Sequence, residues 1–517
     1  MLSSPVKREA FNGSFQHEEK MKFKCNGANC FIEMPPIGAM DYIDNALTYT
    51  DQGAVQRNRN RKGKYRELET VSCLDKKRRC FPVGLLKRVC RTLDIQNMSY
   101  EIEYMVAPSE PAGLDYPDWA KDHQKRLADT AVEEVRSIGQ SPTGSGKTSA
   151  IAFFCQQFPE ASILVIAHKT GIVKNNKKTL EGYLGESVGE YTGRKKTFQR
   201  ITVATINSLY QNRKRLMETL ADIDILVVDE CHNVSKGMWS CVAEAMTGRS
   251  YSWGVSATPY RKNGDDLWME GVLGPVKCKV TEQEMVDKAI IQQPRYCLLK
   301  FDHPYYRGHK DRKFEETLDG RRIPYYNTWN GKPHRDEIYY KGIVANTERN
   351  SLFIDTLSYY LNHPKRQGVA LLLFQLKEQG WMLWDLAKDQ GLPVDYADGE
   401  TPHSRRQELI KGMRDGSRPA VIASKILDEG EDIPNLEFVG IAGGGGNSRA
   451  VTQQVGRVIR TAANALALDI YDQERWYLER NADDRQNHIQ TLYPGSVETV
   501  ASMNHVYRWI DRCLESG

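Results

Sequence analysis

Short apolar runs separated by charged stretches dominate the chain after residue 112. Runs of this length, bounded by polar residues, are typical of buried strands. They read ILVIA, ITVAT, DILVVD and SWGVSAT at 163–167, 201–205, 224–229 and 252–258. Charged helical segments separate the first three runs, and this alternation predicts a parallel sheet with helices on both faces.

The same pattern returns later in the chain. The runs VALLLF, AVIAS and FVGIAG lie at 369–374, 420–424 and 438–443. Residues 291–344 interrupt it, because they are rich in Tyr, Arg, Lys and His, and we expect an irregular linker there. The prediction is an α/β chain with two parallel-sheet domains in tandem, at 113–290 and 345–517, the second ending in a short helical tail.

Residues 1–112 differ from the rest and are expected to form a small accessory domain. They are basic, rich in cysteine and interrupted by Pro and Gly. The segment CFPVGLLKRVCRTLD at 80–94 predicts one amphipathic helix. Its apolar stripe consists of Leu85, Leu86, Val89 and Leu93, and its outer face carries Lys87, Arg88 and Arg91.

Composition limits the class of protein. The 517 residues are 40% hydrophobic and 27% charged, which is ordinary for a globular protein of two or three domains. No apolar run approaches the ~18 residues of a membrane span, and the N-terminus has no apolar signal region. We expect no membrane contact and a cytoplasmic location, in the host cytoplasm if the chain is viral.

Eleven cysteines in a chain of this length indicate reduced thiols in place of a disulfide framework. Cys25, Cys30, Cys73 and Cys80 form a candidate zinc quartet. The gaps of four and six residues within its pairs are wider than usual for zinc knuckles, so plain thiols are the alternative expectation.

The net charge of +4 is unevenly distributed. Residues 57–91 contain thirteen Lys/Arg and three Asp/Glu, a net charge of +10, which leaves −6 for the remainder. Such a block is an electrostatic footprint for nucleic acid or a solvated surface. The candidate contacts in this block are Arg57, Arg59, Arg61, Lys62, Lys87 and Arg88.

The segment SPTGSGKTSA at 141–150 has the form of a phosphate-binding loop that opens a helix, although Ser141 replaces the first glycine. Gly144 and Gly146 let backbone N–H groups turn toward phosphate oxygens. Lys147 would supply a positive charge to the β/γ phosphates, and the Thr148 hydroxyl would ligate Mg²⁺.

The segment DILVVDECHNV at 224–234 brings two adjacent carboxylates to the end of an apolar strand. Ligands of open α/β sheets bind at the carboxyl ends of the strands. Asp229 would hold the metal through water, and Glu230 would orient and deprotonate the attacking water. ATP and Mg²⁺ are therefore the expected cofactors.

These motifs resemble those of superfamily 2 helicases of the DExH type. The resemblance includes SAT at 256–258, DHQKRLADTAV, IAHKTGIVKN, VATINSL, SKILDEGEDIPNLEFVGIAG and QQVGRVIR, in order over about 113–470. It implies two RecA-like domains. It also places Gln124 toward adenine, Thr143, Gly144, Ser145, Gly146, Lys147 and Thr148 around the phosphates, and His168, Lys169 and Thr205 on the nucleic-acid backbone.

The resemblance also assigns roles in the second domain. Gly430 and Asp432 would close over the nucleotide. Arg457 and Arg460, which would otherwise be a solvated basic helix face, take the place of arginine fingers that reach the γ-phosphate. ATP would then clamp the two domains together, and hydrolysis would release them.

The N-terminal segment, including LTYTDQGAVQRNRNRKGKY, looks like the corresponding module of phage UvsW-type DNA helicases. We therefore expect an ATP-driven helicase that remodels duplex or branched DNA, and duplex, branched or single-stranded DNA is the expected partner. Two alternatives remain open: an RNA helicase or motor of a restriction or defence complex, and a nucleotide-switched binding module without turnover. Because every nucleotide motif follows residue 112, removal of the basic block is expected to leave a soluble ATPase core.

Overall fold

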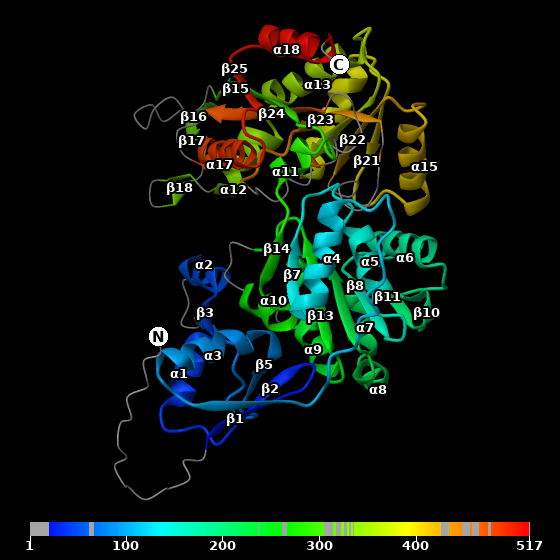
Figure 1. Cartoon of the computed structure of the whole chain (residues 1–517). Helices are drawn as coiled ribbons and strands as arrows, with labels where there is room; N and C mark the ends of the chain where they lie inside the picture. The colour runs from blue at the N-terminus through cyan, green and yellow to red at the C-terminus, as the bar shows by residue number, and fades with distance from the viewer. Residues whose placement is uncertain are drawn as a thin grey trace, which may run out of the picture.

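The structure of the chain, a computed structural model, has three bodies arranged in a row, with the small N-terminal domain at one end (Figure 1). It describes residues 20–60, 67–235, 237–260, 266–303, 314–316, 322–324, 328–329, 332–333, 335–424, 433, 435–446, 455–456, 465–473 and 477–515. The predicted site residues Arg61, Lys62, Gly430, Asp432, Arg457 and Arg460 lie outside these ranges.

The first large domain is built on an eight-stranded sheet in the order β10-β9-β11-β8-β12-β13-β7-β14. Its strand pairs are parallel except for the β9–β10 edge. The strands are β7 (Arg136–Gln140), β8 (Ile163–Ala167), β9 (Gly189–Tyr191), β10 (Lys196–Thr197), β11 (Ile201–Thr205), β12 (Ile225–Asp229), β13 (Tyr251–Ser256) and β14 (Val276–Lys279). The apolar runs predicted as strands between 163 and 258 are confirmed as β8, β11, β12 and β13.

Helices cover both faces of this sheet, because its strands carry apolar side chains on both faces. In β8, Ile163 and Val165 pack with one core cluster, whereas Leu164 and Ile166 pack with another, because successive side chains point to opposite faces. The helices are α4 (Asp122–Glu134), α5 (Lys147–Gln156), α6 (Thr170–Leu184), α7 (Ile206–Asn212), α8 (Met217–Ala221), α9 (Met238–Ala245), α10 (Asp266–Leu273) and α11 (Glu282–Asp287).

The second large domain contains a seven-stranded parallel sheet in the order β21-β22-β20-β23-β24-β15-β25. The strands are β15 (Arg295–Asp302), β20 (Val369–Phe374), β21 (Val394–Ala397), β22 (Ala420–Ser424), β23 (Leu436–Ile441), β24 (Leu466–Gln473) and β25 (Val497–Val500). Its helices are α12 (Arg335–Tyr339), α13 (Thr347–Leu361), α14 (Lys377–Asp389), α15 (His403–Arg414), α17 (Tyr477–Leu492) and α18 (Met503–Glu515). The predicted α/β class with two tandem sheet domains is confirmed.

The prediction of an irregular linker over 291–344 is wrong at its start. Residues 295–302 form β15, which lies inside the second sheet between β24 and β25. Its central residues, from Tyr296 to Leu299, are buried. The strand has eight residues, but only Tyr296 to Leu299 form an apolar run, and a segment rich in Tyr and Arg follows it, so its apolar character did not stand out.

Two buried arginines support the glycine-rich segment 442–446 of this domain. Arg349 binds Asp472 with its Nε 2.7 Å from Oδ1, and Arg485 binds Asp469 with its Nε 2.7 Å from Oδ2. All four side chains are at most 1% exposed. Both buried charges are therefore paired. Both guanidinium groups also donate hydrogen bonds to backbone carbonyls of 442–446, which hold this segment in place.

The N-terminal domain contains a four-stranded sheet in the order β5-β2-β1-β6. Its elements are β1 (Met21–Cys25), β2 (Asn29–Glu33), α1 (Ala39–Ala46), β3 (Thr48–Thr50), α2 (Gln52–Asn60), β4 (Thr70–Ser72), β5 (Cys80–Pro82), η1 (Val83–Leu85), α3 (Leu86–Ile95) and β6 (Tyr100–Tyr104). The prediction of one helix over 80–94 is therefore wrong for its first part. Residues 80–82 pair with β2, because Pro82 has no N–H for a helix interior but fits the end of a short strand.

The predicted apolar stripe of that helix is confirmed, since Leu85, Leu86, Val89 and Leu93 are all buried. They pack in the core of the N-terminal domain together with Phe23 and Phe81. The stripe residues thus match helical spacing even though the helix begins later than expected.

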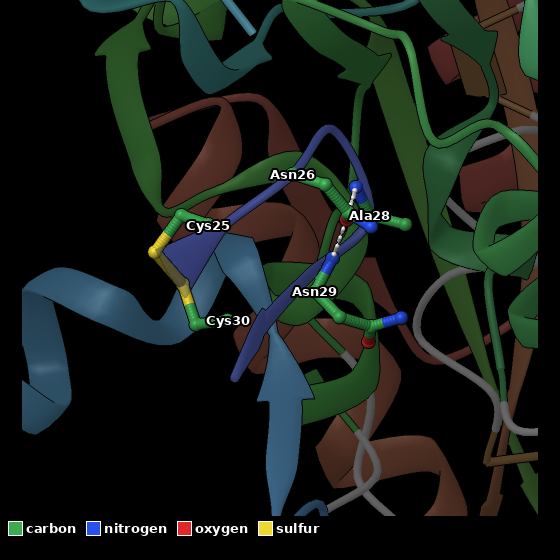
Figure 2. Close-up of a disulfide and its surroundings, with 5 residues drawn as sticks. All are labelled: Cys25, Asn26, Ala28, Asn29 and Cys30. Carbon is green, nitrogen blue, oxygen red and sulfur yellow. Dashed lines mark hydrogen bonds between the residues drawn. A yellow bond between two sulfur atoms is a disulfide. The ribbon is translucent and has the colours of Figure 1, made fainter. Parts of the chain in front are cut away.

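Cys25 and Cys30 form a disulfide across the β1–β2 hairpin, which corrects the expectation of reduced thiols at these positions (Figure 2). The two residues face each other in the strand register, with their Cα atoms 4.1 Å apart. Asn26 shapes the turn between them, because its Oδ1 accepts the N–H groups of Ala28 and Asn29 at 2.8 and 2.7 Å.

The remaining members of the candidate zinc quartet do not join this pair. Cys73 and Cys80 are buried and are not part of a disulfide. Within the part of the chain that the structure describes, no group of three or more His, Cys, Asp or Glu residues could hold a metal ion. In the same residues, no helix is long and apolar enough to cross a membrane.

The N-terminal domain shares its core with the first large domain. Leu267 and Trp268 of α10 belong to the apolar cluster of the N-terminal sheet. The hairpin turn also docks there, with the Gly27 N–H donating to the Thr247 carbonyl at 2.7 Å. Removal of residues 1–110 would expose both α10 side chains, so the expectation of a separable soluble core disagrees with this packing.

Candidate nucleotide-binding site

Four neighbouring strands of the first sheet end at one edge and carry the predicted motifs. The order β8-β12-β13-β7 places the loops after these strands side by side. His168 follows β8, Asp229 ends β12, Ser256 ends β13, and the segment 141–146 follows β7. This edge is where open α/β sheets bind their ligands.

The segment 141–146 forms a tight loop that leads into α5. Gly144 and Gly146 adopt φ angles of 86° and 81°, in the left-handed region that glycine occupies without steric cost. The Ser141 hydroxyl donates to the Ser145 hydroxyl at 2.7 Å, so the residue that replaces the first glycine closes the loop with a hydrogen bond. α5 begins at Lys147, and its N-terminus points its free N–H groups at the loop.

Lys147 lies inside this loop, with a side chain that is 10% exposed. Its Nζ donates to the carbonyls of Ser141 and Pro142 at 3.4 and 3.3 Å and lies 3.9 Å from Glu230 Oε1. The ammonium is therefore held between the loop backbone and the Glu230 carboxylate.

The two predicted metal-binding residues, Thr148 and Asp229, are connected by Asn176 of α6. Thr148 Oγ1 donates to Asn176 Oδ1 at 3.4 Å, and Asn176 Nδ2 donates to Asp229 Oδ2 at 3.0 Å. Asn176 is 1% exposed. Sequence reasoning missed it, although a polar residue between Val173 and Leu180 on the inward stripe of a helix is a recognisable signal.

Glu230 is held by a small network of side chains. Its Oε2 lies 3.2 Å from His232 Nδ1 and accepts a hydrogen bond from Ser256 Oγ at 3.4 Å. His232 Nδ1 also contacts Ser256 Oγ at 2.9 Å, which ties β12 to β13. The backbone of Glu230 has a φ of 53°, an uncommon conformation for this residue type and one that is often found at functional sites.

The pKa values of the two adjacent carboxyl groups are shifted in opposite directions. Burial and the neighbouring charge of Glu230 raise the pKa of Asp229. Burial also acts to raise the pKa of Glu230, but the Lys147 ammonium and the His232 side chain outweigh it and lower that pKa. Glu230 therefore stays ionised beside Lys147, whereas Asp229 lacks a cation at hydrogen-bond distance among the described residues.

Gln124 and the preceding His123 hold the phosphate loop from α4. Gln124 Nε2 donates to the Ser145 carbonyl at 3.1 Å, and its amide lies against Gly146 where a β-carbon would stand. His123 Nε2 donates to the same carbonyl at 2.7 Å, and burial lowers the pKa of this histidine. His123 was not singled out in the sequence, because its contact depends on the fold of the loop.

His168 and Lys169, the two residues predicted to contact the nucleic-acid backbone after β8, directly precede α6. His168 is partly buried, and its Nδ1 contacts Asn233 Nδ2 at 3.1 Å, while the same Asn233 amide donates to the Glu230 carbonyl at 3.1 Å. Lys169 is exposed. This arrangement connects the end of β8 with the segment that carries the candidate base.

Thr205 and the N-terminal candidates have intramolecular contacts of their own. Thr205 is 6% exposed and donates from its hydroxyl to Ser208 Oγ at 2.8 Å at the start of α7. Lys87 pairs with Glu134 at 3.1 Å, and Arg88 Nε donates to the Ala46 carbonyl at 2.9 Å. Arg57 and Arg59 lie in α2, and their side chains are not among those described.

The second domain reaches this edge through Gly456. A β-carbon on Gly456 would lie 3.0 Å from the β-carbon of Thr143 in the phosphate loop. Gly456 immediately precedes Arg457 in the sequence. The described part of the QQVGRVIR motif therefore meets the loop that precedes Lys147.

Comparison with known proteins gives two family matches. Residues 119–261 match the family described as "Type III restriction enzyme, res subunit", and residues 352–462 match the family described as "Helicase conserved C-terminal domain". The two matches coincide with the two large sheet domains and contain the motifs at the shared edge.

Among individual proteins, the chain is similar to a "Putative DNA 3'-5' helicase Rad25" of Haloarcula marismortui, with 24% identity over 72% of this chain and 56% of that protein. It therefore spans about half the length of that relative. It is also similar to the "ATP-dependent DNA helicase uvsW" of Enterobacteria phage T4, with 19% identity over 69% of this chain and 68% of that protein.

A solved structure shares the fold. A fragment of a putative HsdR subunit of a type I restriction enzyme from Vibrio vulnificus superposes with a TM-score of 0.54. The sequence identity is 16%, and the match covers 81% of this chain and 73% of that one. The tandem parallel-sheet architecture is thus found in another chain of low sequence identity.

Proposed function

We propose that this chain, which belongs to the superfamily 2 helicases, is an ATP-driven motor that moves on DNA and remodels duplex or branched DNA. The observation that carries the proposal is the assembly of Lys147, Asp229 and Glu230 at one sheet edge, with Gly456 of the other domain against the same loop. The names of the relatives, which are DNA helicases, support DNA as the polymer.

ATP would bind with its phosphates in the loop 141–146. Lys147 needs only to leave the carbonyls of Ser141 and Pro142 to meet phosphate oxygens, because its ammonium already lies inside the loop. Gln124, which braces the loop at Ser145, is the candidate for adenine contact. The backbone N–H groups that open α5 favour negative charge at this place.

The residues present fit a Mg²⁺ ion. Hard oxygen ligands suit this cation, and the hydroxyl of Thr148 and the carboxylate of Asp229 are both within hydrogen-bond reach of one amide. Thr148 and Asp229 would hold the ion, which when bound neutralises charge on the β and γ phosphates.

Glu230 would act as the base for the attacking water. It remains ionised next to Lys147, and the histidine and serine that contact it fix its orientation. A positioned base of this kind contributes ~10²–10⁴-fold to a proton-transfer step. Arg457 and Arg460 would reach the γ-phosphate from the second domain, where charge develops during transfer, and Gly430 and Asp432 would close over the nucleotide.

Nucleic acid would lie across the ends of β8 and β11, near His168 and Lys169. Contacts to the phosphate backbone give affinity without sequence preference. The N-terminal domain adds exposed cations to this motor. Lys77 and Arg79 are exposed in the turn before β5, whereas Lys76 and Arg78 of the same turn pair with Asp44 and Glu244.

A second candidate function is a motor subunit of a restriction or defence assembly. The match of residues 119–261 to a restriction-enzyme subunit family favours it. Such a motor would hydrolyse ATP on unbranched duplex DNA, whereas the preferred function requires a response to branched DNA. The RNA alternative is distinguished by the same measurement.

The test is ATPase stimulation by single-stranded DNA, duplex DNA, a four-way junction and RNA of matched length, measured side by side. We expect stimulation by DNA, with the junction more effective than the duplex, and Lys147→Ala serves as the control for contaminating ATPase. Stimulation by RNA alone would exclude a DNA motor. Nucleotide binding without turnover under every condition would return the chain to a nucleotide-switched binding module.

A further inference from the structure

Asn176 lies between the two side chains that would hold Mg²⁺, although it is far from both in sequence. It is 28 residues from Thr148 and 53 residues from Asp229. It comes from the middle of α6, one face of which packs on the sheet through Val173 and Leu180. A buried amide on such a face requires partners, because a buried polar group without one loses its hydrogen bonds to water and gains none in return.

Both ends of the amide are used, and they are used in opposite senses. The Nδ2 group donates to Asp229 Oδ2 at 3.0 Å, and the Oδ1 atom accepts from Thr148 Oγ1 at 3.4 Å. A neutral amide is suited to this place, because one planar group offers a donor and an acceptor. It satisfies one carboxylate oxygen without adding a charge that would compete with a cation.

Within the described part of the chain, Asp229 has two hydrogen bonds to its carboxylate, and only the one from Asn176 comes from another element of the fold. Asp229 is 6% exposed, and its other oxygen, Oδ1, accepts the backbone N–H of Glu230 at 2.9 Å. That second bond is local and fixes the carboxylate to its own strand. The Asn176 bond is the one that relates Asp229 to α5 and to the Thr148 hydroxyl.

We propose that Asn176 is a positioning residue that sets the distance and orientation between the Thr148 hydroxyl and the Asp229 carboxylate, and so tunes the affinity of the site for the divalent cation. This inference rests on the proposed ATPase function for its cation. Residues that orient metal ligands by hydrogen bonds affect metal affinity strongly although they do not touch the ion.

The position of Asn176 on α6 gives this role a second consequence. α6 begins directly after Lys169 in the candidate nucleic-acid path, and Asn176 lies two turns further along the same helix. A shift of the start of α6 when nucleic acid binds would therefore move the amide that holds both ligands. The cation site and the polymer path would then be connected through one rigid element.

The test is direct binding of Mn²⁺, as a paramagnetic substitute for Mg²⁺, to the full-length protein with bound ADP, followed by electron paramagnetic resonance. We expect Asn176→Ala to weaken Mn²⁺ binding by ~10–100-fold, the usual effect of losing an outer hydrogen bond to a metal ligand. The matched control is Asn175→Ala, because Asn175 is the neighbouring residue of the same helix and is exposed. Equal Mn²⁺ affinity in the two variants would overturn the proposal.

Fold integrity is checked by binding of ADP without metal, which a positioning role leaves unchanged and a structural role does not. If Asn176→Ala loses metal-free ADP binding, the near-isosteric Asn176→Leu, which keeps the volume, is measured in its place. Loss of metal-free ADP binding in both variants would make Asn176 a structural residue and overturn the proposal. No nucleic acid enters this test, so failure of DNA stimulation in the wild type would reject the proposed function without affecting the result.

Discussion

Gly456 of the second domain lies against Thr143 of the first, with only 3.0 Å between the Thr143 β-carbon and the place of a Gly456 β-carbon. The contact joins two segments that are more than 300 residues apart in the chain. It puts the start of the arginine-bearing motif at the phosphate loop, so the geometry at this point decides whether the two domains can close on a nucleotide.

Gly456→Val is therefore expected to impair turnover more than nucleotide binding. The added side chain would collide with Thr143 and hold the domains apart, and a displacement of about 1 Å at such a site costs ~10²-fold in rate. Steady-state kcat and ADP affinity are the quantities to measure. Gly182→Val is the control, because a β-carbon at Gly182 in α6 meets nothing within 4 Å. Wild-type turnover in Gly456→Val would show that closure does not use this contact.

Glu230→Gln is expected to bind ATP and to hydrolyse it ~10²–10⁴-fold more slowly, because the amide cannot accept the proton of the attacking water. The contacts to His232 and Ser256 can persist, so the fold is retained. Single-turnover hydrolysis and binding of a fluorescent ATP analogue would separate the two effects. An unchanged hydrolysis rate would remove Glu230 from the role of base.

Arg457→Ala and Arg460→Ala should each lower kcat by ~10³–10⁵-fold with a much smaller effect on ATP affinity, because arginine fingers act on charge that appears in the transition state. Arg349 of the same domain is an unsuitable control, since it is buried in an ion pair. Arg414 at the end of α15 is exposed and serves instead. Normal turnover with weaker DNA binding would identify the pair as a basic surface face.

Lys169→Ala is expected to weaken binding to all DNA sequences about equally, because a backbone contact carries no sequence information. The slope of log affinity against log salt concentration should become shallower by ~0.9 on duplex DNA for the loss of one phosphate contact. Lys365→Ala, at an exposed position in the second domain, is the control. An unaltered slope would place Lys169 outside the path.

Acid sensitivity is expected to arise from the buried carboxylate of Asp472. Burial alone would raise its pKa, but Arg349 and the hydrogen bond from His303 outweigh this and lower the pKa to about 2. A carboxyl group whose pKa is lower in the folded state stabilises the fold above the pKa of the unfolded state. This contribution, about 2 kcal/mol from a shift of about two units, is lost as the pH falls from about 4 toward 2.

The corresponding measurement is urea unfolding of the wild type and of Asp472→Asn at neutral pH and through this acidic interval. The wild type should lose stability on acidification, and the variant should be less stable at neutral pH with a flatter dependence. Asp389→Asn, an exposed carboxylate at the end of α14, should keep the wild-type profile. Parallel profiles for Asp472→Asn and the wild type would contradict this assignment.

The motifs of the first domain could be predicted because their chemistry is local. The residues of the phosphate loop lie within the short segment 141–148, and Asp229 and Glu230 are adjacent. Their spacing in the sequence is therefore enough to recognise each motif. The buried strands were equally visible, since a run such as 163–167 is apolar throughout. Each of these features depends on neighbours in the sequence.

The features that were missed depend on neighbours in space. Asn176 meets Thr148 and Asp229 only when α6 packs beside α5 and β12, and Cys25 meets Cys30 because the hairpin register places them opposite each other. The strand β15 was overlooked because only residues 296–299 of it form an apolar run and its surroundings are polar. The helical spacing of Asn176 marks it as a buried polar residue, but the sequence does not show which residues it contacts.

The helix α10 packs against both the N-terminal domain and the first large domain, and so connects the two mechanically. On one side it contributes Leu267 and Trp268 to the core of the N-terminal domain, and on the other it packs against β7 and β13. β7 leads directly into the phosphate loop. Close-packed interiors transmit strain, so a pull on the N-terminal domain is felt at the strand that carries the loop. A force on the N-terminal domain would thus reach the phosphate loop through α10 and β7.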